Sequence, residues 1–449
     1  MDFWRKITSK PTQVIPLGFM ATILVGTLVL MLPVCSASGT WTPFSDALFT
    51  ATSATCVTGL VVQNTATYWS LVGQVVILVL IQIGGMGVIT FATAIFMIAG
   101  RKIGLKQRWI MQESISAPYV GGILNQTRFI LTCAVGIELT GAVLLTFRFV
   151  PQFGLARGLW YSVFHAISAF CNAGFDLMGY DEAYCSLTAY GSDPWVLGVV
   201  SVLIVVGGIG FLTWSDLREH KLHWKRYCLQ TKLVLSTTLI LLIIGFASFM
   251  REFTLARWDP YFDSFGERVL AAIFQAITPR TAGFNAVDYG NLSEGGVFFT
   301  ILLMLVGCSP GSTAGGFKVT TLSVLIVTMV SVFRGKKHAE VFHRRVPTQM
   351  QRSASALFTL YLLLFITAGV CISSLDDLPL SEAMFESASA VGTVGLSMGI
   401  TSTLSQASRA ILICLMFLGR AGGLTLMYAL VERDNAYKMK YPQEPVAIG

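Results

Sequence analysis

Long apolar blocks separated by short polar stretches run along the whole chain. Several blocks are long enough to cross a bilayer as a helix, which takes about 20 residues. The first block starts too far in and runs too long for a cleaved signal peptide, so we expect it to be a retained span. The blocks are Thr12–Val34, Leu71–Ala99, Phe129–Phe147, Val196–Trp214, Leu233–Phe249, Phe298–Val306, Val319–Val332, Leu357–Ile372 and Ala410–Leu430.

Four short stretches, each ending in a glycine, recur between these blocks at nearly equal spacing. Their final glycines are Gly59, Gly174, Gly283 and Gly395, which are 115, 109 and 112 residues apart. A segment of about ten residues precedes each stretch and is too short to cross a bilayer. We expect these segments to be re-entrant helices that return to the outer face: roughly Phe44–Ser53, Leu159–Ser168, Glu267–Ile277 and Ser381–Ser389.

The pattern predicts an all-α integral membrane protein made of four repeats, each a membrane helix, a pore loop and a second membrane helix. Eight spanning helices and four re-entrant pore helices would surround one pore on a pseudo-fourfold axis. Ser45 with Asp46, and Ser381 with Glu382, are expected to cap two of the pore helices and favour their dipoles. The expected repeats are residues 1–109, 110–228, 229–350 and 351–449, the last with a cytoplasmic C-terminal tail.

Glycine at the same point of four loops permits an extended or strained backbone and leaves the carbonyl groups unshielded. Four such loops around one axis would form rings of carbonyl oxygens that replace the hydration shell of a cation. The negative C-terminal ends of the pore helices would favour a cation over an anion. The expected ion-binding residues, mostly through backbone carbonyls, are Cys56, Val57, Thr58, Gly59, Cys171, Asn172, Ala173, Gly174, Arg280, Thr281, Ala282, Gly283, Gly392, Thr393, Val394 and Gly395.

A second glycine motif follows each of the four stretches. It reads Gly-Gly-Met-Gly from Gly84, Gly-Gly-Ile-Gly from Gly207 and Gly-Arg-Ala-Gly-Gly from Gly419. Close packing of the second span against the pore explains these glycines at least as well as direct gating does. The glycines in question are Gly84, Gly85, Gly87, Gly207, Gly208, Gly210, Gly422 and Gly423.

The third repeat carries a longer version of this motif, in which proline, hydroxyl groups and glycines interrupt an apolar span. A regular membrane helix cannot continue through it, so we expect an intramembrane loop over residues 307–318 that acts as a mobile gate. A passive hinge that covers the floor of the cavity is the alternative. The gate residues are Gly307, Ser309, Pro310, Gly311, Ser312, Thr313, Ala314, Gly315, Gly316, Lys318 and Arg420.

Arg420 aligns with Gly85, Gly208 and Cys308 of the other repeats, and a charge inside a span marks a functional position. It is expected either to act as a tethered cation or to latch the gate loop, with a contact that merely joins two helices as the alternative. Lys318 is expected to extend to the inner interface. Arg280 is expected to pin its loop rather than meet the ion.

Charge predicts the orientation of the chain. The expected inner segments hold 21 Lys and Arg residues, whereas the expected outer segments hold 6, so both termini are predicted to be cytoplasmic in the cell membrane. The outer segments hold 15 Asp and Glu residues, which would concentrate cations there. The net charge of +7 therefore indicates contact with anionic lipid rather than nucleic acid.

The residues quoted above resemble the Trk/Ktr/HKT superfamily of potassium transporters over essentially the whole chain. The resemblance depends on the four glycine stretches, on Gly311–Lys318 and on Arg420, and it is strongest to the bacterial Ktr membrane subunit. It implies one potassium path per protomer, a homodimer, and a separate cytosolic octameric ring of RCK-type subunits that bind nucleotide. Serine in place of the first glycine goes with sodium preference in plant relatives, so Gly59 favours potassium. Such relatives are often stimulated by sodium, which no residue here predicts.

Other classes of protein remain as alternatives to potassium uptake. A sodium-selective or sodium/potassium-coupled member of the same fold is the first. An alternating-access symporter is disfavoured by four parallel repeats and few charges at the membrane midplane. An enzyme is disfavoured because the motifs offer no acid, base or nucleophile, and four matching loops disfavour a scaffold. No cofactor is expected, and the only metal expected is potassium, with sodium as a further transported or activating ion.

Overall fold

The computed structural model describes residues 11–98, 104–114, 121–180, 182–221, 223–422 and 444. Gly423 and the predicted C-terminal tail, apart from Glu444, lie outside these residues. The described part is mostly helical. Its four longest apolar helices lie near the starts of the four expected repeats, and each is long enough to cross a membrane: α2 (Pro11–Leu30), α8 (Ile123–Phe153), α12 (Leu229–Glu252) and α16 (Thr348–Asp376).

Apolar side chains on these long helices remain exposed. Leu28 on α2 is 64% exposed, Phe147 on α8 69%, Ile243 on α12 58% and Leu363 on α16 56%. Exposed apolar surface of this extent marks a face that something other than water covers. In helices of this length and composition the cover is the hydrocarbon of a bilayer.

The second apolar segments of the repeats are broken rather than straight. Helix α5 (Leu71–Met86) meets α6 (Val88–Ile98) at 98°, and α10 (Pro194–Ile209) meets α11 (Phe211–His220) at 91°. Gly87 and Gly210 form the two corners with φ of 84° and 95°, which favour glycine. The blocks Leu71–Ala99 and Val196–Trp214 were each expected to be one span; each begins as a bent pair of helices, so whether it crosses the membrane as one span stays a prediction.

In the third repeat, a loop over residues 306–318 separates α14 (Glu294–Leu305) from α15 (Val319–Phe333). The break is therefore shared with the first two repeats, and only its length is peculiar to the third. The last helix among the described residues, α18 (Gln406–Ala421), ends at Gly422 with φ of 83°. The described residues contain four helices that can span, or six if each bent pair is one span, so the count of eight remains a prediction.

The four half-length helices are α3 (Phe44–Cys56), α9 (Leu155–Phe170), α13 (Phe265–Ile277) and α17 (Leu380–Gly392). They are 13 to 16 residues long, somewhat longer than expected. Asp46 and Glu382 stand in first turns as expected, but the capping prediction was wrong. Pro43 and Pro379 occupy the N-cap positions, and no side chain caps either helix.

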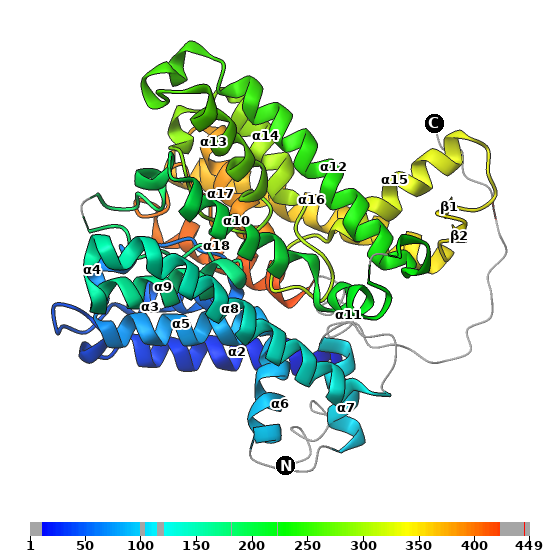
Figure 1. Ribbon diagram of the computed structural model, residues 1–449, viewed down its shortest axis with the longest axis horizontal. Coiled ribbons are helices and arrows are strands. Elements are labelled where there is room, and N and C mark those ends of the chain that lie inside the picture. The colour runs from blue at the N-terminus through cyan, green and yellow to red at the C-terminus, as the bar shows by residue number, and fades with distance from the viewer. Residues whose placement is uncertain are drawn as a thin grey trace.

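Smaller elements complete the described part: α4 (Thr65–Tyr68), α7 (Leu105–Ser114) and a short antiparallel pair, β1 (Glu340–Val341) with β2 (Arg344–Arg345). Five 3-10 turns lie at Pro33–Cys35, Thr188–Tyr190, Trp224–Arg226, Ala256–Tyr261 and Tyr289–Asn291. Figure 1 shows α6 and α7 projecting at the bottom and α15 with the β-pair projecting at the right, away from the half-length helices. Both projections follow a break in a second span.

The interior lies around the half-length helices. Two clusters of buried apolar side chains form it, one mainly from the first two repeats and the other mainly from the last two. Phe49, Phe164, Phe274 and Phe385 are each fully buried. They stand ten positions before the loop glycine, or nine in the third repeat, so the same side chain anchors each half-length helix in the core.

Candidate functional site

Each half-length helix ends in a loop with the same backbone. We call residues 56–59, 171–174, 280–283 and 392–395 loops 1 to 4. Two residues before each final glycine stands a residue with positive φ: Val57, Asn172, Thr281 and Thr393, at 57°, 57°, 68° and 51°. Each final glycine also has positive φ, between 68° and 92°. All four loops therefore contain two residues with positive φ within three positions, although the four sequences differ.

The four loops form a closed ring. A Cβ on Gly59 would lie 2.5 Å from the carbonyl oxygen of Ala173 in loop 2. A Cβ on Gly174 would lie 3.0 Å from the oxygen of Ala282, and one on Gly283 would lie 2.5 Å from that of Val394. A Cβ on Gly395 would collide with the carbonyl oxygen of Thr58 in loop 1, and this contact closes the ring. Each glycine thus faces the carbonyl that precedes the next glycine, and any side chain would obstruct the ring.

A hydroxyl residue at the foot of each loop holds the loop in place, and none of the four was among the predicted site residues. Ser53 accepts a hydrogen bond from the backbone N–H of Gly59 at 3.1 Å, and Ser389 accepts one from Gly395 at 3.0 Å. Ser168 donates to the carbonyl of Phe175 at 2.7 Å, and Thr278 to that of Phe284 at 2.6 Å. The repeated Ser or Thr six residues before the glycine, or five in the third repeat, was the available signal.

The one-residue difference in the third repeat is absorbed where α13 ends. The backbone N–H of Ala282 bonds the carbonyl of Thr278 four residues back, whereas the matching bonds in the other loops span five residues. The five-residue bond is the pattern of a helix that ends in a left-handed residue. The third loop reaches the ring by a tighter turn, so its glycine still occupies the matching place.

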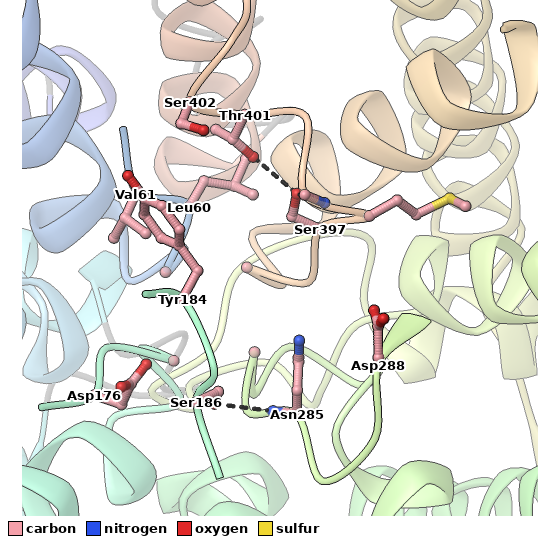
Figure 2. Close-up of a pocket in the computed structure, with 16 residues that line it drawn as sticks. Leu60, Val61, Asp176, Tyr184, Ser186, Asn285, Asp288, Ser397, Thr401 and Ser402 are labelled. Carbon is pink, nitrogen blue, oxygen red and sulfur yellow. Dashed lines mark hydrogen bonds between the residues drawn. The ribbon is translucent and has the colours of Figure 1, made fainter. Parts of the chain in front are cut away.

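On one side of the ring lies an open cavity of about 150 Å³ that all four glycines line. Figure 2 shows Asp176, Asn285 and Asp288 from the segments after loops 2 and 3, opposite Ser397, Thr401 and Ser402 after loop 4. Carboxylates and hydroxyls of this kind attract a cation. Burial raises the pKa of Asp176 to about 6, against a bond from the N–H of Met178 that favours its charged form.

The 307–318 loop covers the other side of the ring. Thr313 donates from its hydroxyl to the carbonyl of Phe170 at 3.1 Å, and Cys308 donates to that of Arg280 at 3.2 Å. A Cβ on Gly315 would collide with the side chain of Thr393. The loop therefore contacts the feet of loops 2, 3 and 4 at once.

Arg420 joins this loop to the first repeat. Its guanidinium donates to the carbonyl oxygens of Thr313 and Gly84, and to that of Gly85 at 3.2 Å. Lys318 folds back onto the same loop, donating to the carbonyls of Ala314 at 2.7 Å and Gly315 at 3.0 Å. The expectation that Lys318 extends to the inner interface was wrong, because backbone oxygens of the loop surround its ammonium group.

The first glycine of the second motif is a packing residue. A Cβ on Gly84, Gly207 or Gly419 would collide with the carbonyl oxygen four residues before the loop glycine, that of Thr55, Phe170 or Val391. A Cβ on Gly85 would lie 2.6 Å from the sulfur of Cys171, and one on Gly208 would lie 2.7 Å from that of Cys308. The second spans therefore press directly on the feet of the loops. Gly87, Gly210 and Gly422 end these helices instead.

Two buried polar side chains stand behind the ring. Arg280 points away from it toward α12, where its guanidinium lies 3.4 Å from the Thr238 hydroxyl, while its backbone carbonyl accepts from Cys308. Glu138 on α8 accepts from the Gln82 amide at 3.0 Å and lies 3.9 Å from the Cys171 sulfur at the foot of loop 2. The Arg280 side chain therefore points away from the ring, and the Glu138 carboxylate lies beside the foot of loop 2.

The structure thus brings the sequence-predicted residues together as two layers, a ring of loops and a loop beneath it. A family model described as "TrkH: Cation transport protein" matches residues 8–438. The chain is 41% identical to the potassium/sodium uptake protein NtpJ of Enterococcus hirae, over 98% of this chain and 97% of that one. It is 40% identical to the Ktr system potassium uptake protein B of Bacillus subtilis, over 99% and 98%.

The fold is also similar to a solved structure. The crystal structure of the potassium transporter TrkH from Vibrio parahaemolyticus superposes with a TM-score of 0.70 at 18% sequence identity, covering 94% of this chain and 84% of that one. The family match spans nearly the whole chain, and the two relatives are aligned end to end. This chain is a membrane protein that belongs to the TrkH family of cation transport proteins.

Proposed function

We propose that the chain takes up potassium across the cell membrane through the ring formed by loops 1 to 4. The observation that carries the proposal is the closed order of the ring, in which each glycine faces the carbonyl before the next glycine. Rings of backbone carbonyls replace the water around a dehydrated cation. The names of the two relatives, a potassium/sodium uptake protein and a potassium uptake protein, agree with this substrate.

The 307–318 loop is the gate in this proposal. Its contacts with the feet of loops 2, 3 and 4 support a position across the path of an ion that leaves the ring. Arg420 latches the gate, because its three carbonyl partners belong to the gate and to the first repeat. A cation that reaches the gate meets the charges of both Arg420 and Lys318, so conduction requires the loop to move.

In this proposal the four expected repeats, residues 1–109, 110–228, 229–350 and 351–449, surround the ion path. The chain crosses the membrane eight times, and both termini lie in the cytoplasm. The cavity lined by Asp176 and Asp288 then faces outward, and α6, α7, α11 and the β-pair face the cytoplasm. We further propose a homodimer with one path per protomer and a separate cytosolic ring of nucleotide-binding subunits that acts on the inner face. The Bacillus subtilis relative is named as one protein of a Ktr system, which supports a second component.

The test is ion uptake by bacteria that lack their own potassium uptake. The chain is produced alone and with a candidate ring subunit, and initial rates of potassium and sodium uptake are measured at several external sodium concentrations. We expect potassium uptake that exceeds that of cells with an empty vector and that outcompetes sodium. Sodium uptake without potassium uptake would instead assign the chain to the sodium-selective alternative, and no ion uptake with any partner would contradict the proposed function.

A further inference from the structure

Beyond the ring itself, a buried polar side chain on each half-length helix ties down the segment that follows the loop glycine. On α17 this is Glu386, which is fully buried nine residues before Gly395. Its carboxylate accepts from the hydroxyl of Ser397 and, at 3.0 Å, from that of Thr401. The two hydroxyls lie 3.0 Å apart, and Ser397 also accepts from the N–H of Gly399 at 2.9 Å. Glu386 therefore holds the outer segment of loop 4 at both ends.

The matching positions of two other helices make the same kind of contact with different chemistry. His165 lies nine residues before Gly174. Its Nε2 accepts from the backbone N–H of Leu177 at 3.4 Å, and its Nδ1 donates to the backbone carbonyl of Tyr161 at 2.7 Å. Gln275, eight residues before Gly283, accepts from the Tyr289 hydroxyl at 2.7 Å. His165 and Gln275 are also fully buried.

The first repeat achieves the same connection from one helical turn earlier. Asp46, thirteen residues before Gly59, accepts from the Gln63 amide at 2.8 Å and pairs with Arg409 at 3.1 Å. Four unrelated side chains thus fix four equivalent segments.

Among the described residues, Glu386 differs from the other three because it is a buried carboxylate without an ion pair. Asp46 pairs with Arg409, whereas the ion pairs found in the described part of the chain do not include Glu386, whose carboxylate accepts hydrogen bonds from hydroxyl groups. A carboxylate buried in this way costs free energy, and an ionisable group inside a membrane protein marks a functional position. Ser397 and Thr401, its two donors, line the outer cavity with the four glycines. The carboxylate therefore contacts side chains that themselves line the proposed path of the ion.

We propose that Glu386 is a positioning residue for ion selection: through Ser397 and Thr401 it holds the segment after Gly395, and so keeps the carbonyl of Val394 at its place in the ring. This inference rests on the proposed function. A ring of carbonyls discriminates between ions only while its oxygens keep their places. A side chain that acts through the hydroxyls should therefore affect the choice between potassium and sodium more than the amount of folded protein.

The test compares Glu386→Ala with Glu386→Gln in the complete chain, in cells that lack their own potassium uptake. Initial potassium and sodium uptake are measured beside the amount of protein in the membrane. We expect Glu386→Ala to lower the potassium-to-sodium ratio about tenfold, as loss of an outer partner does at a metal site. Glu386→Gln should retain about half of the discrimination or more, because its amide still bonds both hydroxyls, at the lower strength of a neutral group.

Two further variants complete the experiment. Glu382→Ala, on the same helix and half-buried, should stay within about twofold of the native ratio, as substitutions away from buried networks do. Thr401→Val removes one of the two donors and keeps the shape of the side chain, with an expected loss of about threefold. If Glu386→Ala does not reach the membrane, Thr401→Val provides the test.

A native ratio in Glu386→Ala or in Thr401→Val, at a native amount of protein, would overturn the positioning role. So would a Glu386→Gln variant as poor as Glu386→Ala, because the carboxylate charge rather than its hydrogen bonds would then decide selection. The native chain separates this failure from a failure of the proposed function. If the native chain takes up no potassium, both proposals fall, whereas selective native uptake with an unchanged Glu386→Ala removes only the positioning role.

Discussion

Gly59 faces the carbonyl oxygen of Ala173 so closely that a Cβ would lie 2.5 Å from it. Gly59→Ser should therefore push this carbonyl out of the ring and strain a backbone with φ of 92°. We expect the potassium-to-sodium uptake ratio to fall about tenfold, which corresponds to about 1.4 kcal/mol. Gly39→Ser is the matched control, since Gly39 also has positive φ but nothing within 4 Å of its Cβ position. A ratio unchanged by Gly59→Ser would show that loop 1 does not select the ion.

Releasing the latch should open the gate. Arg420→Gln removes a charged donor from the carbonyls of Thr313, Gly84 and Gly85, each bond contributing about 1.5–3 kcal/mol at most. We expect maximal potassium uptake without the ring subunit to rise several-fold, with Arg334→Gln, an exposed arginine at the end of α15, as control. A changed affinity for potassium at an unchanged maximal rate would favour the tethered-cation role instead.

Two glycines of α10 should differ in their tolerance of a methyl group. A Cβ on Gly207 would collide with the Phe170 carbonyl, whereas one on Gly198 would meet nothing within 4 Å. We expect Gly207→Ala to destabilise the protein by about 1–3 kcal/mol, as overpacking does. Gly198→Ala should be neutral or stabilising by up to about 1 kcal/mol. Thermal unfolding of the purified proteins in detergent measures both, and equal midpoints would refute the packing role of Gly207.

External acid should slow uptake. The pKa of Asp176 is raised to about 6 by burial, so its carboxylate is charged above this pH and neutral below it. Asp288 lines the same cavity, so the loss of charge on Asp176 lowers but does not abolish the attraction for cations. We expect potassium uptake at low external potassium to fall as the pH drops through about 6. Asp176→Asn should be slow at all pH values and lose this step, whereas Glu294→Gln, an exposed outer carboxylate, should keep it.

The sequence predicted the ring because glycine is nearly irreplaceable where φ is positive and a neighbouring backbone is in contact. The repeated glycines therefore reveal the loops, the half-length helices before them and the interrupted span of the third repeat. The residues with positive φ two positions earlier, such as Val57 and Thr393, give no such signal, because their conformation is imposed by the end of the helix.

Features that depend on the folded conformation rather than on the sequence pattern escaped prediction. The corners at Gly87 and Gly210 lie inside uniformly apolar blocks, where hydropathy alone indicates a continuous span. The position of Lys318 depends on the carbonyls of Ala314 and Gly315, which only the folded conformation of its own loop brings within reach. Glu386 and Gln275 belong to helices whose polar positions are read as solvent-facing until the packing around them is known.

The corner at Gly210 divides the second span of the second repeat into two mechanical parts. Above it, Gly207 on α10 is pressed against the foot of loop 2. Below it, the N–H of Phe211 on α11 bonds the carbonyl of Gly311 in the gate loop at 2.8 Å. The same loop is also bonded above the corner, where the N–H of Ser309 donates to the carbonyl of Gly208 at 3.1 Å. In the proposed mechanism, this one bent helix pair therefore joins the ring to the gate, and a movement of α11 is transmitted to both.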